Sequence, residues 1–471
     1  MKMRYFYEIE PSPKPAFISS ENEMLTYADI HSEIKRIRPL VKTRKLAFCL
    51  CENSPSGIVS YLICLNCGIV PLLFDKRIED GLLERLINRY DPAYVFTPRD
   101  MSSKFPEWDL VRDIYGYALL ESRTSSEYIL HDDLALLLTT SGSTGSPKLV
   151  RQSYTNIQSN AEAIVSYLGI TEEERPVTTL PMNYTYGLSI INSHILAGAT
   201  IYTTDRPINF KAFWDFVRAN GITSFGGVPF TYLMLKKIKF QKMDLPSLRY
   251  ITQAGGKLDP ELQDEFAQWA EKNGKEFVVM YGQTEATARM GYLPREMCSK
   301  KKGSMGIAIP GGQFTLIDEN DKEIRVPEVV GELIYTGPNV TMGYAESVED
   351  LAKGDERNGV LATGDMAKMD EDGYYYIVGR KKRFLKIFGN RVNLDEIDRL
   401  IVSRFGDLDC ASTGTDDHMA VFITKESAAG DVKAWLSSVT HLSESAFKVI
   451  YIPEIPRNES GKVLYADLKA E

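Results

Sequence analysis

The chain has 471 residues, more than one ordinary domain holds, so its length predicts a large unit and a smaller one. Apolar residues make up 44% and charged residues 25%, a balance that excludes a disordered or fibrous chain. The net charge of −9, from 55 basic and 64 acidic side chains, excludes a general electrostatic attraction to nucleic acid or to an anionic membrane.

Neither the apolar runs nor the cysteines indicate a secreted or membrane-spanning protein. The opening MKMRYFYEIEPSPKP lacks the apolar core of a signal peptide, and no apolar run reaches the ~18–20 residues of a spanning helix. Six cysteines are too few for a disulfide framework in a chain of this length. Cys64 and Cys67 form a CxxC pattern, but no second pair or nearby histidine completes a metal site, so we interpret them as packing residues. We therefore expect a cytoplasmic protein.

The first 330 residues alternate between helical and strand patterns. Thr26 precedes a segment with apolar residues at three-to-four spacing, which predicts a capped helix. Short apolar runs predict strands at 45–53, 70–75, 93–98, 134–140, 178–183, 199–204, 224–229, 250–255 and 276–282. Such alternation predicts layered α/β structure with mainly parallel strands. In open sheets of this kind, ligands bind at the loops beyond the carboxyl ends of the strands.

After residue 331 the pattern changes to short β-like runs with turn residues between them, typical of a small barrel or meander. The segment GRKKRFLK, residues 379–386, then marks a change in composition, because five of its eight residues are basic. The remainder has the pattern of a small α+β unit. We predict an N-terminal domain over 1–379 with a small β-barrel-like subdomain, a hinge at 380–383, and a mobile C-terminal domain over 384–471.

The segment TSGSTGSPK, residues 140–148, combines hydroxyl side chains, two glycines and a lysine directly after a predicted buried strand. Glycines let backbone N–H groups approach phosphate oxygens, while hydroxyls and a lysine add donors and positive charge. The segment does not match the Walker pattern GxxxxGK[ST]. It indicates a triphosphate-binding loop, and a flexible surface loop is the alternative.

Three further segments carry weaker signals of their own. In YGQTE, residues 281–285, Thr284 could donate to a phosphoryl oxygen and Glu285 is a hard oxygen ligand for Mg²⁺, although a helix start also favours these residues. In LATGD, Asp365 could accept hydrogen bonds from both hydroxyls of a ribose. The alternative is an ordinary turn, since turns favour Gly-Asp. In PRNESGK, Lys462 lies on a predicted loop, where a solvated lysine is the ordinary interpretation.

Taken together, in this order and spacing, these segments and GRKKRFLKIFGNRVNLDEID resemble the adenylate-forming superfamily of acyl- and aryl-CoA synthetases, stand-alone adenylation domains and luciferases. The resemblance runs from Thr26 to the C-terminus. It implies that ATP and Mg²⁺ convert a small carboxylic acid into an acyl-adenylate with release of pyrophosphate, and that the acyl group then passes to a thiol, most simply of coenzyme A. One alternative acceptor is the phosphopantetheine of a carrier protein. A non-catalytic nucleotide-binding protein is the alternative of another class.

The resemblance also assigns roles by position. ATP's phosphates would be bound by Thr140, Ser141, Ser143, Thr144 and Lys148, and the α-phosphate by Thr284. Nucleotide contacts would come from Gly256, Lys257, Tyr281, Gly282, Gln283, Asp365, Ile377, Arg380 and Arg391, with Asp365 and Arg380 at the ribose. Glu285 would hold the metal, and Lys462 would bridge the substrate carboxylate and the nucleotide.

For the second step, the resemblance implies that the C-terminal domain turns about Lys382 and that Gly389 comes to line the path of the thiol. The basic segment around Lys382 could otherwise be a nucleic-acid-binding patch, which the acidic net charge argues against. The short C-terminal part favours a carrier protein over coenzyme A. No nucleic-acid partner is expected.

The acyl substrate is less well indicated. Family members often carry a histidine where this chain has Tyr184, and the segment 182–192 offers no acid to pair with an ammonium group. We therefore expect a carboxylic acid without an α-amine. By position, the candidate pocket residues are Tyr184, Gly187, Phe225, Gly226, Val228 and Gly255.

Overall fold

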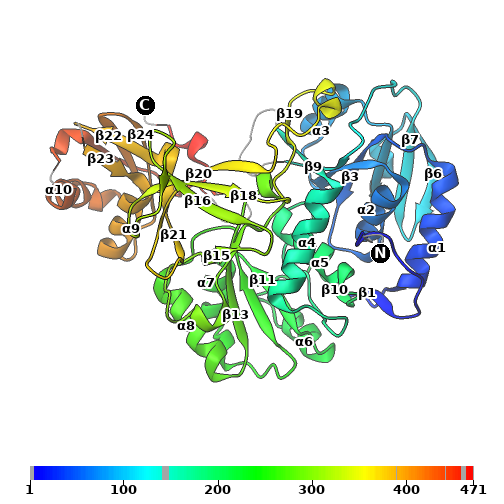
Figure 1. Ribbon diagram of the computed structural model, residues 1–471, viewed down its shortest axis with the longest axis horizontal. Helices are drawn as coiled ribbons and strands as arrows, with labels where there is room; N and C mark the ends of the chain where they lie inside the picture. The colour runs from blue at the N-terminus through cyan, green and yellow to red at the C-terminus, as the bar shows by residue number, and fades with distance from the viewer. Residues whose placement is uncertain (1–4, 140–147, 389, 441, 458–462, 470–471) are drawn as a thin grey trace. The chain divides into compact units, whose positions relative to one another are not determined.

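The computed structural model describes residues 5–139, 148–388, 390–440, 442–457 and 463–469. They form two compact units, one made of residues 1–314 with 335–361 and the other of 315–334 with 362–471 (Figure 1). The predicted bounds 1–379 and 384–471 rest on a hinge and stay a prediction. Among the described residues no helix has the length and apolar character to cross a membrane.

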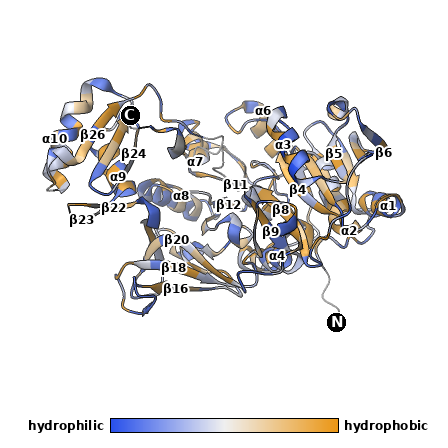
Figure 2. Ribbon diagram, turned by 90° about the horizontal axis from the view of Figure 1, so that it is seen from above, coloured by the Kyte–Doolittle hydropathy of each residue, from blue (hydrophilic) through white to orange (hydrophobic). Residues whose placement is uncertain are grey.

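The first unit contains an eight-stranded sheet. In order across the sheet its strands are β19 (Gly343–Ala345), β9 (Leu149–Ser153), β8 (Leu134–Thr139), β4 (Val70–Asp75), β3 (Leu46–Cys51), β5 (Tyr94–Pro98), β7 (Tyr117–Ser122) and β6 (Trp108–Ile114). The central four, β8, β4, β3 and β5, are parallel, and the flanking pairs are antiparallel. Every residue of β3 is buried, as expected where both faces of a sheet are covered, and apolar residues gather along these strands (Figure 2).

Two smaller sheets complete the first unit. One has the order β11 (Ser224–Gly227), β12 (Tyr250–Gln253), β13 (Glu276–Tyr281), β14 (Gly291–Tyr292) and β15 (Ile307–Ala308), and the other β10 (Ile201–Thr203), β1 (Pro15–Ser19) and β2 (Met24–Thr26). Strands β11, β12 and β13 are parallel. The prediction of layered α/β structure is confirmed. In the two larger sheets of this unit, the parallel strands are β8, β4, β3 and β5 in one and β11, β12 and β13 in the other, while the strands that flank them are antiparallel.

The helices of this unit are α1 (Tyr27–Ile37), α2 (Pro55–Cys67), α3 (Asp80–Tyr90), α4 (Tyr154–Leu168), α5 (Thr185–Leu196), α6 (Lys211–Ala219), α7 (Pro229–Lys237) and α8 (Pro260–Lys272). Thr26 caps α1 by accepting from the backbone N–H of Asp29, which confirms the predicted cap. Every residue of α2 except Asn66 is buried. Cys64 and Cys67 are buried free thiols of this helix, as the packing interpretation requires.

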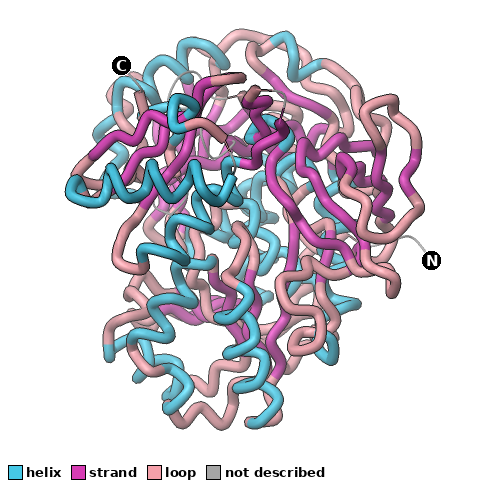
Figure 3. Tube along the Cα trace, turned by 90° about the vertical axis from the view of Figure 1, so that its left-hand side faces the viewer, coloured by secondary structure: helices cyan, strands magenta, loops and turns pink. Residues whose placement is uncertain are grey.

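The second unit is built on a five-stranded sheet and a small α+β part. The sheet has the order β17 (Glu323–Ile324), β16 (Gln313–Ile317), β18 (Gly331–Thr336), β20 (Val360–Met369) and β21 (Tyr375–Arg380). There follow β22 (Phe384–Ile387), β23 (Asn390–Asn393), α9 (Leu394–Phe405), β24 (Cys410–Thr415), β25 (His418–Ile423), α10 (Ala429–Thr440) and β26 (Phe447–Tyr451). Figure 3 distinguishes these helices from the strands by colour. The predicted β-rich subdomain and α+β end of the chain are confirmed.

Candidate active site

Two neighbouring strands of the eight-stranded sheet flank the predicted phosphate loop in the sequence. Thr139 at the end of β8 pairs with Leu149 at the start of β9, and the two strands are antiparallel. Thr140, Ser141, Ser143 and Thr144 lie outside the described residues. Lys148 is described and exposed, and its Nζ lies 2.6 Å from Oε1 of the equally exposed Glu346. Because such surface ion pairs are weak, Lys148 can exchange this partner for a phosphate.

The segment YGQTE follows β13, as predicted, and its acidic side chain is held in place. Glu285 lies in a 3₁₀ turn, Thr284–Ala286, and the hydroxyl of Tyr344 donates to its Oε1 at 2.8 Å. Burial, and next the negative charge of Glu285, raise the pKa of Tyr344 to about 12, so this hydroxyl remains a donor at neutral pH. One oxygen of the carboxylate is thus fixed, and in the described part of the chain no hydrogen bond is made to Oε2.

The backbone of Glu285 is anchored by two further residues. Its carbonyl oxygen accepts from the hydroxyl of Thr341 at 2.9 Å and from Nη1 of Arg357 at 3.1 Å. The guanidinium of Arg357 also lies 4.7 Å from the ring centre of Tyr344. The described residues contain no cluster of three metal-ligating side chains. Magnesium commonly takes one carboxylate together with substrate phosphates and water, and a single oriented Glu285 fits that ligand set.

The chain after Gly282 folds tightly back on itself. A Cβ at Gly282 would lie 1.5 Å from the carbonyl oxygen of Ala288, so only glycine fits. Ala288 itself adopts φ 110°, a strained value for a residue with a side chain. The amide of Asn339 donates to the carbonyl oxygens of Ala286 and Arg289 at 2.8 Å each and holds the turn.

Two of the predicted nucleotide-binding segments meet at one edge of a sheet. Because β12 and β13 are parallel neighbours in register, the loop with Gly256 and Lys257 and the segment Tyr281–Gln283 both follow carboxyl ends of strands. Gly256 and Lys257 are exposed, and the carbonyl of Gly256 accepts from Nε2 of Gln253 at 2.9 Å. These segments form an accessible edge.

Several predicted acyl-pocket residues lie beside the same edge. The ring centres of Tyr184 and Tyr186 are 6.2 Å apart. A Cβ at Gly255 would lie 2.5 Å from the hydroxyl of Tyr184 and 3.1 Å from Cγ1 of Val228, and one at Gly226 would lie 2.9 Å from the hydroxyl of Tyr186. The two glycines therefore let the tyrosine rings approach the strand ends.

Two other predicted pocket residues, Phe225 and Gly187, make close packing contacts with the surrounding chain. Phe225 is 2% exposed, and its ring packs against Trp214 and Phe240. Gly187 allows the first turn of α5 to approach the backbone, since a Cβ there would lie 2.2 Å from the carbonyl oxygen of Pro181.

In the second unit, Asp365 on β20 and Arg380 on β21 are paired in register, and Arg380 Nε lies 2.8 Å from Oδ1 of Asp365. The carboxylate is 4% exposed and Arg380 is half-exposed. Ile377 lies on β21 as well, and Arg391 lies on β23. The pairing brings together the two residues predicted to contact a ribose.

The predicted hinge residue Lys382 is exposed in a 3₁₀ turn, Lys381–Arg383. Its neighbour Arg383 is anchored by ion pairs with Asp395 and Asp398. Gly389 and Lys462 lie outside the described residues.

Four residues of this site were not singled out from the sequence: Arg289, Asn339, Tyr344 and Arg357. Asn339 and Tyr344 lie in the segment GELIYTGPNVTMGY, residues 331–344, which also resembles the superfamily pattern. Nothing in the sequence near Arg289 or Arg357 distinguishes these arginines from surface residues.

A model of the AMP-binding enzyme family matches residues 8–345. The chain belongs to this family. This places it in the adenylate-forming superfamily, as the motifs predicted.

Similar proteins include the 2-succinylbenzoate–CoA ligase of Bacillus subtilis, 24% identical over 97% of this chain and 95% of that protein, and the long-chain-fatty-acid–CoA ligase of Salmonella typhimurium, 28% identical over 93% and 81%. Among solved structures, the o-succinylbenzoate CoA synthetase of Bacillus subtilis with AMP has a TM-score of 0.77 at 21% identity, covering 97% of this chain and 95% of that one. MatB of Rhodopseudomonas palustris with ATP has a TM-score of 0.76 at 22% identity, covering 96% and 94%. This likeness confirms the fold.

Proposed function

We propose that the protein uses ATP and Mg²⁺ to convert a carboxylic acid into an acyl-adenylate, releases pyrophosphate, and transfers the acyl group to the thiol of coenzyme A. The observation that carries the proposal is the carboxylate of Glu285, which one hydroxyl fixes and which lies at an accessible edge where parallel strands end. The matched family and the names of the relatives, which are CoA ligases, support the same reaction.

The first step brings two anions together, because a carboxylate attacks the α-phosphorus of ATP. Glu285 would hold one Mg²⁺, which supplies positive charge at the phosphates, and Thr284 would donate to an α-phosphate oxygen. Lys148 and the hydroxyls of 140–144 would bind the departing phosphates. Asp365 would accept the ribose hydroxyls, with Arg380 holding its carboxylate in position.

We further propose that Lys462 compensates the charge of the attacking carboxylate, that residues 384–471 turn about Lys382, and that Gly389 then lines the path of the thiol. The substrate is a carboxylic acid without an α-amine, because segment 182–192 carries no acid that could pair with an ammonium group.

Product analysis tests the proposal. The purified protein is incubated with Mg·ATP and a panel of aryl, short-chain, long-chain and amino acids, with coenzyme A or a phosphopantetheinylated carrier protein as acceptor. Equal amounts of AMP, pyrophosphate and acyl-CoA are expected with one class of acid. If a thioester forms on the carrier protein alone, the carrier protein and not coenzyme A is the acceptor. If no acid yields AMP, the non-catalytic alternative is favoured.

A further inference from the structure

Among the residues whose burial is described, two arginines are buried, and an acidic side chain pairs with only one of them. Arg151 is 0% exposed and pairs with Glu356, and four backbone carbonyl oxygens also accept hydrogen bonds from its guanidinium. Its charge is therefore balanced within the protein. Arg289 is 2% exposed and differs from Arg151 in its partners.

Within the described part of the chain, Arg289 has only neutral partners. Its Nε and Nη2 donate to Oγ of Ser189 at 3.2 and 3.0 Å, and Nη1 contacts the sulfur of Met280. The face of the guanidinium lies 4.0 Å from the ring centre of Tyr186. A guanidinium stays protonated in proteins, and a buried charge is costly unless an opposite charge pairs with it.

The tyrosines around Arg289 do not supply the missing negative charge. Burial raises the pKa of Tyr184 to about 12 and also raises the pKa of Tyr167 and Tyr186. All three stay neutral at physiological pH. The described surroundings of Arg289 thus offer the face of one aromatic ring and neutral hydrogen-bond partners, and they contain no anion in contact with the guanidinium.

Arg289 lies next to the proposed acyl pocket. Tyr186, on which its guanidinium stacks, approaches Gly226 at the end of β11 and the ring of Tyr184. Tyr184 is itself only partly buried. Arg289 also follows Glu285 by four residues, within the turn that Asn339 clamps.

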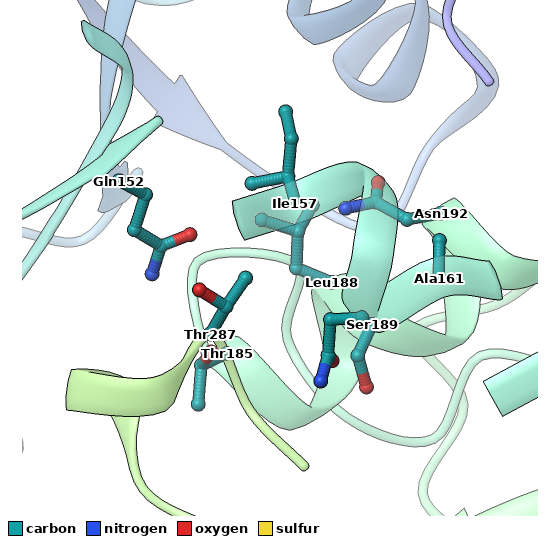
Figure 4. Close-up of a pocket in the computed structure, with 9 residues that line it drawn as sticks. Gln152, Ile157, Ala161, Thr185, Leu188, Ser189, Asn192 and Thr287 are labelled. Atoms are coloured by element: carbon teal, nitrogen blue, oxygen red, sulfur yellow. The ribbon is translucent and has the colours of Figure 1, made fainter. Parts of the chain in front are cut away.

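Ser189 also lines a small cavity between β9, α4, α5 and the turn after Glu285 (Figure 4). Its volume of about 10 Å³ holds about one water molecule. Three buried atoms of its lining have no hydrogen-bond partner within the described part: Gln152 Nε2, Asn160 Oδ1 and Asn192 Oδ1. Unpaired buried polar groups beside an uncompensated cation indicate a region that a ligand or water completes.

We propose that Arg289 binds a second carboxylate of the acid that is adenylated, so that the preferred substrates are dicarboxylic acids. The inference rests on the proposed function, because it concerns the acyl end of the same site. The guanidinium fork matches a carboxylate in geometry and charge, and the second carboxylate takes the place of the thioether of Met280 as its partner. The reacting carboxylate stays at the edge of β11, β12 and β13.

Matched pairs of acids test the inference in the unaltered protein. Butanoate is compared with butanedioate, hexanoate with hexanedioate, and benzoate with benzene-1,4-dicarboxylate, by the kcat/KM of ATP–pyrophosphate exchange. In at least one pair the diacid is expected to be favoured about 100-fold, the factor that a desolvated charge pair contributes. Equal or better use of the monoacid in every pair overturns the inference while leaving the proposed function intact. Absence of exchange with all six acids counts against both.

The variant Arg289→Met, of similar length and without charge, is expected to lose the preference for the diacid over the matched monoacid, because the KM for the diacid rises. Direct binding gives a second readout, because the favoured diacid should raise the Tm of the unaltered protein and not that of the variant. A variant that retains the preference overturns the inference. If Arg289→Met does not fold, Arg289→Lys keeps the charge without the fork, and it should lower the preference about tenfold. An unchanged preference for the diacid in Arg289→Lys would also overturn the inference.

Discussion

The hydroxyl of Tyr344 donates to Oε1 of Glu285 at 2.8 Å and so links β19 to the turn that follows β13. The same tyrosine ring lies beneath the guanidinium of Arg357, which binds the backbone of Glu285. A residue outside the strongest motifs therefore sets the orientation of the carboxylate to which we assign the metal.

Removal of that hydroxyl should weaken metal use more than it weakens folding. In Tyr344→Phe the ring keeps its packing, but Glu285 loses a charge-assisted hydrogen bond, and we expect the Mg²⁺ concentration for half-maximal exchange to rise about tenfold. Magnesium titrations of the two proteins measure this. Tyr128→Phe is the matched control, because its hydroxyl donates to the carbonyl of Asp91 at 3.0 Å, away from the site. Identical titrations for all three proteins would rule out the positioning role.

The turn after β13 should tolerate no side chain at its start. In Gly282→Ala the new methyl would overlap the carbonyl of Ala288, so the turn must unwind and we expect exchange to fall at least about 100-fold with a lower Tm. Gly430→Ala provides the control, because a Cβ there meets nothing within 4 Å and should leave both quantities nearly unchanged. Full activity in Gly282→Ala would show that the turn does not need this close approach.

Asp398, beside the predicted hinge, gives a pH-dependent prediction. Burial raises its pKa to about 6, from an ordinary value of 3.8. The folded state thus favours the protonated form, and this contribution is fully present below pH 3.8 and is lost as the pH rises through 6. Its size is about 3 kcal/mol, from about two pKa units.

Asp398→Asn should therefore gain stability relative to the unaltered protein between pH 4 and pH 7, since the amide stays neutral. Thermal unfolding of both proteins across this range measures the difference. A constant difference in Tm would mean that Asp398 titrates normally.

Lys462 is expected to act in the first step alone. Lys462→Ala should slow adenylation at least about 100-fold, because the attacking carboxylate loses its compensating charge, while thiolysis of added acyl-adenylate continues. Single-turnover assays of each step separate the two effects. Equal loss in both steps would contradict the proposed movement about Lys382.

Local pattern was enough to predict part of this structure. The cap at Thr26 depends on contacts three residues apart. The pairing of Asp365 with Arg380 on neighbouring strands was not predicted, because the resemblance gave only their shared role at a ribose. The contact between Tyr344 and Glu285 joins residues 59 positions apart, and it depends on the register of β19 against β9. Such a contact leaves no trace in local spacing.

The burial of Arg289 could not be predicted for a related reason. An arginine in a polar turn is ordinarily exposed, and only the packing of α5 against the turn places it under Tyr186 beside Ser189. Phe225 shows the opposite case. The resemblance made it a pocket candidate by position, whereas its ring packs against Trp214 and Phe240.

Acid-dependent exchange of pyrophosphate into ATP tests the central claim most directly, because it requires reversible formation of an acyl-adenylate and no acceptor thiol. The unaltered protein should catalyse exchange with its acid and Mg²⁺ in the absence of coenzyme A, and Glu285→Gln should lose at least about 100-fold of that rate while its Tm is kept. Exchange that proceeds equally well in Glu285→Gln, or that needs no acid, would contradict the assignment.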